Sequence, residues 1–138
     1  MNTNEKGNVG LANVIADAVN KGYFIFMPFS DTTCVDLIIA NKKMITKRAQ
    51  VKYISENKDG LMIISTSTVI NGKKTPVDLT KIDFWAVYCP DTKLLYYVNV
   101  RDLIGKSVIS LRIREPKQIQ RGIKYANEYL NLDNIWND

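Results

Sequence analysis

Two short stretches decide the fold of this chain, Asp36-Leu37-Ile38-Ile39 and Gln50-Val51-Lys52. Asp36 begins the apolar run Leu37-Ile38-Ile39, which is typical of a strand, and it precedes Gln50, in the next expected strand, by 14 positions. Side chains alternate between the two faces of a strand, so Gln50 and Lys52 point to one face and Val51 points to the other. If the two strands are neighbours, Asp36, Gln50 and Lys52 converge.

This combination of side chains suits phosphodiester hydrolysis. A hard cation such as Mg²⁺ prefers oxygen ligands, which Asp36, Gln50 and the Val51 carbonyl can supply, and Lys52 can orient a water and offset negative charge. The pattern is short and recurs by accident. An aspartate at a strand start is often only a turn residue, and an exposed lysine on a strand is common.

Length and composition favour one globular domain over residues 1–138. The chain is 46% hydrophobic and 24% charged, has no apolar span long enough for a bilayer, and has a polar N-terminal segment. We therefore expect a cytoplasmic protein without a membrane partner.

Histidine is absent, and the two cysteines, Cys34 and Cys89, are far apart. This excludes Ser-His-Asp and Cys-His catalysis, and the cysteine spacing does not match a zinc site, so both cysteines are expected to be reduced thiols. Any catalysis has to use carboxylates, lysine, tyrosine or a bound metal.

The net charge of +5 favours a polyanionic partner. Basic residues group around the expected site and near the C-terminus, although a solvated basic surface is the alternative explanation. The first group is Lys42, Lys43, Lys47, Arg48 and Lys52, and the second is Arg112, Arg114, Lys117, Arg121 and Lys124.

Periodicity predicts an α/β (α+β) chain with a helix at each end and strands between them. The expected helices cover residues 7–20 and 117–130, with a helical turn near 101–104. The expected strands cover residues 23–27, 34–40, 44–54, 61–70, 84–89, 94–100 and 108–113.

Several motifs surround the site: Lys6-Gly7, Lys21-Gly22-Tyr23, Pro28-Phe29-Ser30-Asp31, Arg48-Ala49-Gln50-Val51-Lys52 and Tyr88-Cys89-Pro90-Asp91-Thr92. Together they resemble the group I intron-associated PD-(D/E)xK endonucleases, in particular the intron-encoded homing endonucleases of cyanobacteria. The resemblance covers most of the first 100 residues, and the archaeal Holliday junction resolvases share the core more distantly.

The resemblance implies a restriction-endonuclease-like fold, with a mixed central sheet flanked by helices and an added β-hairpin region for DNA contact. It also implies Mg²⁺-dependent cleavage of double-stranded DNA by a homo-oligomer, a dimer or a tetramer. The family's metal aspartate falls on Asp36, its polar position on Gln50 and its lysine on Lys52, and Val51 offers a carbonyl to the metal.

One position departs from the family pattern. The family has a glutamate four residues after the glycine that matches Gly7, and this chain has Leu11 there. Leucine cannot bind a cation, so one carboxylate remains where the family has two. Three explanations stay open: a deliberately disabled variant, a naturally weakened enzyme, or a helix that buries Leu11 in the core.

Two other classes of function compete with a nuclease. One is a DNA-binding protein of the same fold without turnover, with affinity from phosphate contacts and base reading by a hairpin. The other is a structural protein without a nucleic acid partner. The residues expected to contact DNA are Lys6, Lys42, Lys43, Lys47, Arg48, Ser65, Ser67, Lys73 and Lys74.

The C-terminal apolar residues have two interpretations. They either form an oligomer interface or close the core of their own protomer. They are Ile119, Ile123, Leu130, Leu132, Ile135 and Trp136.

Overall fold

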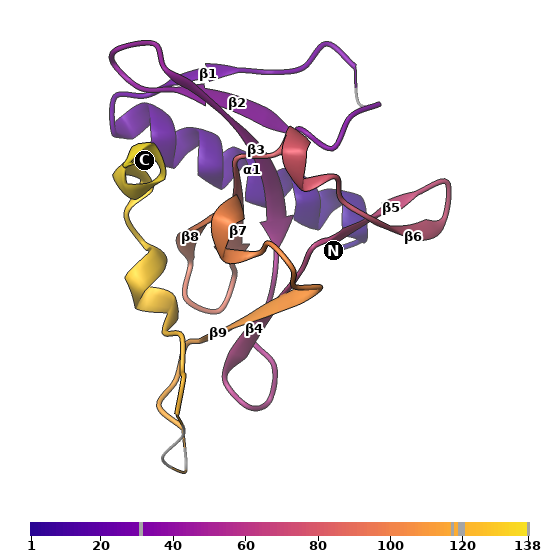
Figure 1. The fold of residues 1–138 in the computed structure, drawn as a ribbon, viewed down its shortest axis with the longest axis vertical. Coiled ribbons are helices and arrows are strands. Elements are labelled where there is room, and N and C mark those ends of the chain that lie inside the picture. The colour runs from indigo at the N-terminus through magenta and orange to yellow at the C-terminus, as the bar shows by residue number, and fades with distance from the viewer. Residues whose placement is uncertain (31, 117, 119–120, 138) are drawn as a thin grey trace.

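A computed structural model describes residues 1–30, 32–116, 118 and 121–137. It contains one α-helix, nine strands and four short 3₁₀ helices in this part of the chain (Figure 1). The elements are α1 (Thr3–Asn20), β1 (Phe24–Phe26), β2 (Leu37–Ala40), β3 (Thr46–Tyr53), β4 (Leu61–Ser65), β5 (Ser67–Ile70), β6 (Lys73–Pro76), η1 (Leu79–Lys81), β7 (Phe84–Cys89), β8 (Leu94–Asn99), η2 (Val100–Asp102), β9 (Val108–Arg112), η3 (Ala126–Tyr129) and η4 (Leu132–Trp136).

The central sheet has five strands in the order β1-β2-β3-β7-β8. It is mixed as expected, because β3 pairs with β7 in parallel while the other neighbouring pairs are antiparallel. Strand β7 is buried along its whole length, which is typical of a strand covered on both faces. No helix in the described part of the chain is long and apolar enough to cross a bilayer.

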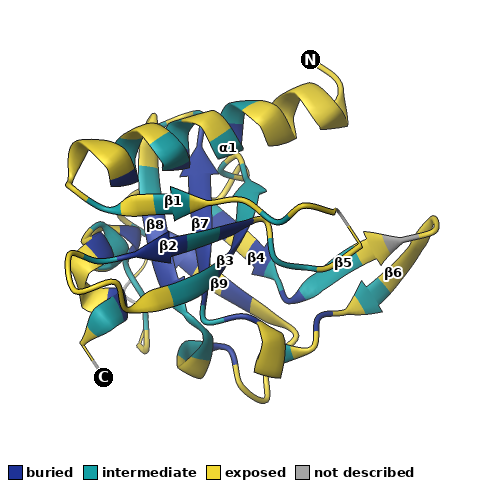
Figure 2. Cartoon of the chain, turned by 90° about the horizontal axis from the view of Figure 1, so that it is seen from above, coloured by how far each residue is buried: buried dark blue, intermediate teal, exposed yellow. Residues whose placement is uncertain are grey.

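Each face of the sheet carries its own apolar cluster. Helix α1 covers one face (Figure 2), where Val14 and Ala18 pack with Leu37, Ala49 and other sheet residues. On the opposite face the two-stranded β4–β9 sheet packs its residues against Trp85 and other sheet residues. The sheet is thus flanked by one α-helix and by a second layer of strands and 3₁₀ turns, where a further helix was expected.

Helix α1 begins earlier than the periodicity predicts. The Asn2 side chain caps it by accepting a hydrogen bond from the Glu5 amide at 2.9 Å. The helix ends before Gly22, whose φ of +87° suits glycine and turns the chain into β1.

The expected strand 61–70 is two strands that separate at Thr66. The Thr66 amide donates to the Ser107 carbonyl at 3.0 Å, and its own carbonyl accepts from the Val77 amide at 2.9 Å. On one side of this residue β4 pairs with β9, and on the other β5 pairs with β6. The β5–β6 hairpin therefore leaves the body of the protein, as Figure 1 shows.

The expected helix 117–130 is wrong over its described residues. Gly122 has a φ of +69°, outside the helical region, and the Lys124 carbonyl accepts a hydrogen bond from the Arg112 amide at 2.8 Å. The chain here runs beside β9 in place of forming a helix, and η3 is the one helical turn described within the range 117–130. Lys117 and Ile119 lie outside the described residues.

Among the C-terminal apolar residues, Leu132 and Ile135 close the core of the protomer and are too buried to form an interface. Ile123, Leu130 and Trp136 are partly exposed, so the interface interpretation stays a prediction for them. Leu132 and Ile135 are buried in the cluster beneath α1, and Trp136 packs against it. The Trp136 indole donates to the Ile45 carbonyl at 2.8 Å and stacks on Tyr23, which ties the C-terminus to the sheet.

An ion pair next to the centre of the sheet predicts acid sensitivity. Asp83 accepts from the Arg48 amide at 2.7 Å and from its Nε at 3.0 Å. Burial opposes ionisation, but the hydrogen bonds and charge of Arg48 outweigh it and hold the pKa of Asp83 below its usual value. A depressed pKa stabilises the fold above the unfolded-state pKa, and this stability is lost as the pH falls.

We therefore expect Asp83→Asn to lower the free energy of unfolding near neutral pH by about 1 kcal/mol, allowing for solvent screening. The deficit should shrink as the pH falls below the usual aspartate pKa of about 3.9 and through the lowered folded-state pKa of Asp83, where the wild-type carboxylate also becomes neutral. Denaturant unfolding at several pH values measures it, with Glu128→Gln at an exposed position as control. A deficit that does not change with pH would contradict the electrostatic explanation.

Candidate active site

The Asp36 carboxylate lies at the beginning of β2 and is fixed by two bonds to β3. The Asp36 amide donates to the Ala49 carbonyl at 2.9 Å, and its Oδ2 accepts from the Val51 amide at 2.8 Å. The N–H and C=O of one strand residue point to the same side, so the Val51 carbonyl also faces the Asp36 side of β3. This bond brings the two stretches together as their sequence predicts.

Gln50 and Lys52 point away from α1, as the alternation along β3 requires. Their parallel partners are Trp85 and Val87, both in the cluster opposite the helix. Lys52 is half-buried, and its Nζ donates to the Ser67 carbonyl at 3.2 Å. Gln50 is buried, and its Oε1 has no hydrogen-bond partner among the described residues.

The surrounding protein perturbs both charged groups of the site. Desolvation raises the pKa of Asp36, although the Val51 amide and the Lys52 charge act in the opposite direction. Burial lowers the pKa of Lys52, which the Asp36 charge raises and the Lys74 charge lowers further. Opposite shifts in two neighbouring groups of one site are common in active sites.

The donor atoms present fit one hard cation. A buried amide oxygen without a partner is costly, and a cation bound by Gln50 Oε1 and Asp36 would remove that cost. No group of three or more cysteine, aspartate or glutamate side chains that could hold a metal occurs in the described residues. Within these residues Asp36 is thus not part of a ready-made cluster of carboxylates, and backbone, amide or water oxygens would help to complete the shell.

Leu11 is half-buried and packs against the cluster on the helix face of the sheet. Its neighbour Gly10 lies over the end of β3, where an added Cβ would be 3.6 Å from the Lys52 carbonyl oxygen. Position 11 is therefore close in sequence to the helix residue that contacts β3, but the side chain it carries joins the core.

The residues expected to contact DNA do not form one cluster. Lys42 and Lys43 lie on the β2–β3 turn, at the opposite end of the hairpin from Asp36, beside Tyr23 and Trp136. Arg48 is engaged by Asp83, and Lys47 has a partner of its own. Lys6 is exposed on the first turns of α1.

The β5–β6 residues lie closer to the site than the sequence indicates. The Ser67 carbonyl holds Lys52, the Ser65 hydroxyl accepts from the Ser67 amide at 3.1 Å, and Lys74 is near enough to affect the pKa of Lys52. Lys73 follows the hairpin tip at Gly72 and is exposed.

A pocket beside Asp36 is missed by the sequence patterns. It has a volume of about 370 Å³ and is lined by Met27, Phe29, Val35, Asp36 and other residues of the β1–β2 connection. The Phe29 side chain is fully exposed. The quoted Pro28-Phe29 motif marks this segment, but nothing in it indicates that the segment borders the carboxylate.

A family model of PD-(D/E)XK endonucleases matches residues 1–132. The chain belongs to this family. Among solved structures, the bacterial homing endonuclease I-Ssp6803I has the same fold, with a TM-score of 0.72 over 94% of this chain and 88% of that chain at 20% identity. Among curated proteins, no sequence matches this chain. The family resemblance that the sequence motifs indicate is thus confirmed.

Restoring the family's helix carboxylate tests the meaning of Leu11. We expect Leu11→Glu to increase Mg²⁺-dependent nicking of plasmid DNA, because a second carboxylate would strengthen cation binding. The control is Ile15→Glu, one helical turn further along the same half-buried face. No gain for Leu11→Glu, with folding and DNA affinity intact, would show that the leucine does not limit the site.

Proposed function

We propose that this chain is a site-specific endonuclease of double-stranded DNA, a homing endonuclease that depends on Mg²⁺ and is attenuated by Leu11. The observation that carries the proposal is the Val51–Asp36 hydrogen bond, which holds Asp36 against the strand that carries Gln50 and Lys52. Family membership supports a nuclease, and the metal, the target and the residual rate are parts of the proposal.

Each residue of the site has a distinct role in this proposal. Asp36, the Val51 carbonyl and Gln50 Oε1 would hold the cation, which supplies Lewis-acid activation and charge neutralisation at the scissile phosphate. Lys52, anchored on Ser67, orients the attacking water and offsets negative charge that develops on the phosphoryl oxygens. Anchoring at the Ser67 carbonyl limits the positions of the ammonium group before DNA arrives.

The β5–β6 hairpin is proposed to contact DNA. It projects from the body of the protein (Figure 1). It pairs Val69 with Lys74 and leaves Val69 largely exposed. A two-stranded ribbon fits the major groove of B-DNA, where polar side chains read base edges and lysines contact phosphates. Lys73 and Lys74 are the phosphate contacts that we favour on this ribbon.

A homo-oligomer, either a dimer or a tetramer, would let the protein read a long site. Strand β1 is an edge strand of the sheet and exposes Phe24 and Phe26, and the following segment exposes Met27 and Phe29. An exposed apolar edge of this kind supports association.

We also propose that residues 1–138 act as one domain in the cytoplasm, where the free Cys34 and Cys89 would stay reduced.

The packing of Leu11 favours a second candidate function, DNA binding without cleavage. Its side chain belongs to the core cluster, so no helix carboxylate completes the cation shell. Such a protein would keep salt-dependent affinity for duplex DNA and would show no metal-dependent turnover.

Plasmid nicking separates these functions. We expect the wild type to nick supercoiled DNA when Mg²⁺ is present, and Lys52→Ala to lose the activity by about 100-fold or more while duplex affinity stays nearly unchanged. Lys81→Ala, at an exposed position on η1, is the control.

Two results would count against the proposal. Binding without nicking by the wild type, at any Mg²⁺ concentration tried, would favour the DNA-binding function. Absence of both binding and nicking would reject a nucleic acid function.

A further inference from the structure

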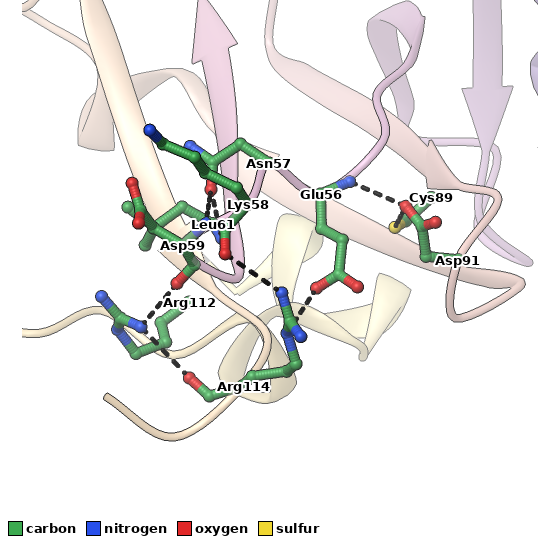
Figure 3. Close-up of polar contacts among 9 residues, drawn as sticks. All are labelled: Glu56, Asn57, Lys58, Asp59, Leu61, Cys89, Asp91, Arg112 and Arg114. Atoms are coloured by element: carbon green, nitrogen blue, oxygen red, sulfur yellow. Dashed lines mark hydrogen bonds and ion pairs between the residues drawn. The ribbon is translucent and has the colours of Figure 1, made fainter. Parts of the chain in front are cut away.

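A basic pocket lies away from the proposed active site, between the turn 56–60 and the end of β9. Figure 3 shows the polar contacts of this region. Its volume is about 530 Å³, and three basic residues line it: Lys58, Arg112 and Arg114. Asp59 and Glu115 line it as well. Neither the cation ligands nor the DNA-contacting hairpin described above belong to this pocket.

Arg112 is the unusual residue of the pocket, because its charged side chain is only 7% exposed. Its Nη1 donates to the Asp59 carbonyl at 3.0 Å and to the Arg114 carbonyl at 3.3 Å, as Figure 3 shows. No described carboxylate forms an ion pair with it, although the ion pairs of other arginines are present. A buried positive charge without a carboxylate is energetically costly.

Two nitrogens of this guanidinium lack partners among the described residues. Nε is completely buried without a hydrogen bond, whereas Nη2 has no protein acceptor and is not among the buried unsatisfied atoms. Nη2 is therefore accessible at the pocket that Arg112 lines. A guanidinium with an accessible, unused N–H is well suited to bind an oxyanion.

The surroundings hold this arrangement rigidly. Arg114 Nε forms an ion pair with Glu56 at 3.1 Å, and the Gly60 carbonyl accepts from the Ile113 amide at 2.8 Å. Gly60 has a φ of +78°, and a Cβ there would lie 3.0 Å from the Arg114 Cβ. The turn and the end of β9 thus close on each other only because position 60 is glycine, which organises the pocket before a ligand binds.

We propose that this pocket binds a phosphate group, with Arg112 Nη2 as the central donor and Lys58 and Arg114 at its sides. The bound anion would compensate the buried Arg112 charge, which the protein leaves without a carboxylate. In the form that we favour, which rests on the proposed function, the phosphate belongs to the backbone of the DNA substrate.

The position of the pocket agrees with such a contact. Strand β4 begins at Leu61 in the pocket and leads to Ser67, whose carbonyl holds Lys52. Six residues of extended chain span up to about 20 Å. Phosphates along one DNA strand advance by about 3.4 Å per nucleotide, so the contact would fall within about six nucleotides of the cleaved bond. A contact of this kind fixes the register of DNA without reading its bases.

Fluorescence anisotropy with duplex DNA across a range of NaCl concentrations tests the favoured form. We expect Arg112→Gln to weaken binding by about tenfold and to reduce the slope of log affinity against log salt by about one. Lys58→Gln, at an exposed position, should also weaken DNA binding and reduce the salt slope, and it should not affect folding. Lys81→Gln is the matched control, because it removes an equal charge outside the pocket.

Thermal unfolding with inorganic phosphate, compared with NaCl at equal ionic strength, tests the pocket without DNA. Stabilisation of the wild type but not of the two pocket variants, together with unchanged DNA affinity, would assign the pocket to a free phosphate compound. If the wild type does not bind DNA at all, the proposed function fails. The thermal unfolding with inorganic phosphate then shows by itself whether the pocket binds a phosphate group. Variants that match the control in both arms would overturn the proposal.

Discussion

One hydrogen bond, from the Val51 amide to Asp36 Oδ2, brings the ends of β2 and β3 together at the candidate site. The bond uses a backbone group that would otherwise lack a partner at the point where β2 begins. It orients the carboxylate toward the side of β3 on which the Val51 carbonyl lies, while the alternation of β3 places Gln50 and Lys52 on the face opposite α1. The same strand therefore builds a core with one face and a reactive site with the other.

The division of the sheet into two faces explains how the site is connected to the rest of the protein. The α1 face is apolar and includes Leu11, whereas the opposite face carries the β4–β9 layer and the hairpin that leaves it at Thr66. Ser67 begins that hairpin, and its carbonyl accepts a hydrogen bond from Lys52. The hairpin proposed to contact DNA is therefore bonded directly to the lysine proposed to assist cleavage. Movement of the hairpin would therefore act directly on the position of Lys52.

Sequence patterns predict the central part of this structure because its elements are set by local periodicity. The strand 84–89 is predicted to the residue and the mixed sheet is confirmed, while Asp36 is held against β3 by its bond to the Val51 amide. The joint role of Asp36, Gln50 and Lys52 stays a prediction. The C-terminal helix is wrong because its apolar spacing continues through Gly122, which has a positive φ, and through Tyr125, which pairs with Arg112 of β9. The sequence also groups Lys42 and Lys43 with the site because they are near it in the chain. In the hairpin they lie on the turn, at the end opposite Asp36, so nearness in sequence does not bring them to the site.

Metal binding at Asp36 is the most direct test of the account, because it measures the donor set without requiring turnover. Electron paramagnetic resonance of Mn²⁺, titrated with the wild type and Asp36→Asn in the presence of duplex DNA, separates bound from free cation. The account predicts a bound ion in the wild type that is lost in Asp36→Asn, with DNA affinity retained. Equal Mn²⁺ binding by both proteins, or none by the wild type, would contradict the assignment of a cation site to Asp36, Gln50 and Val51.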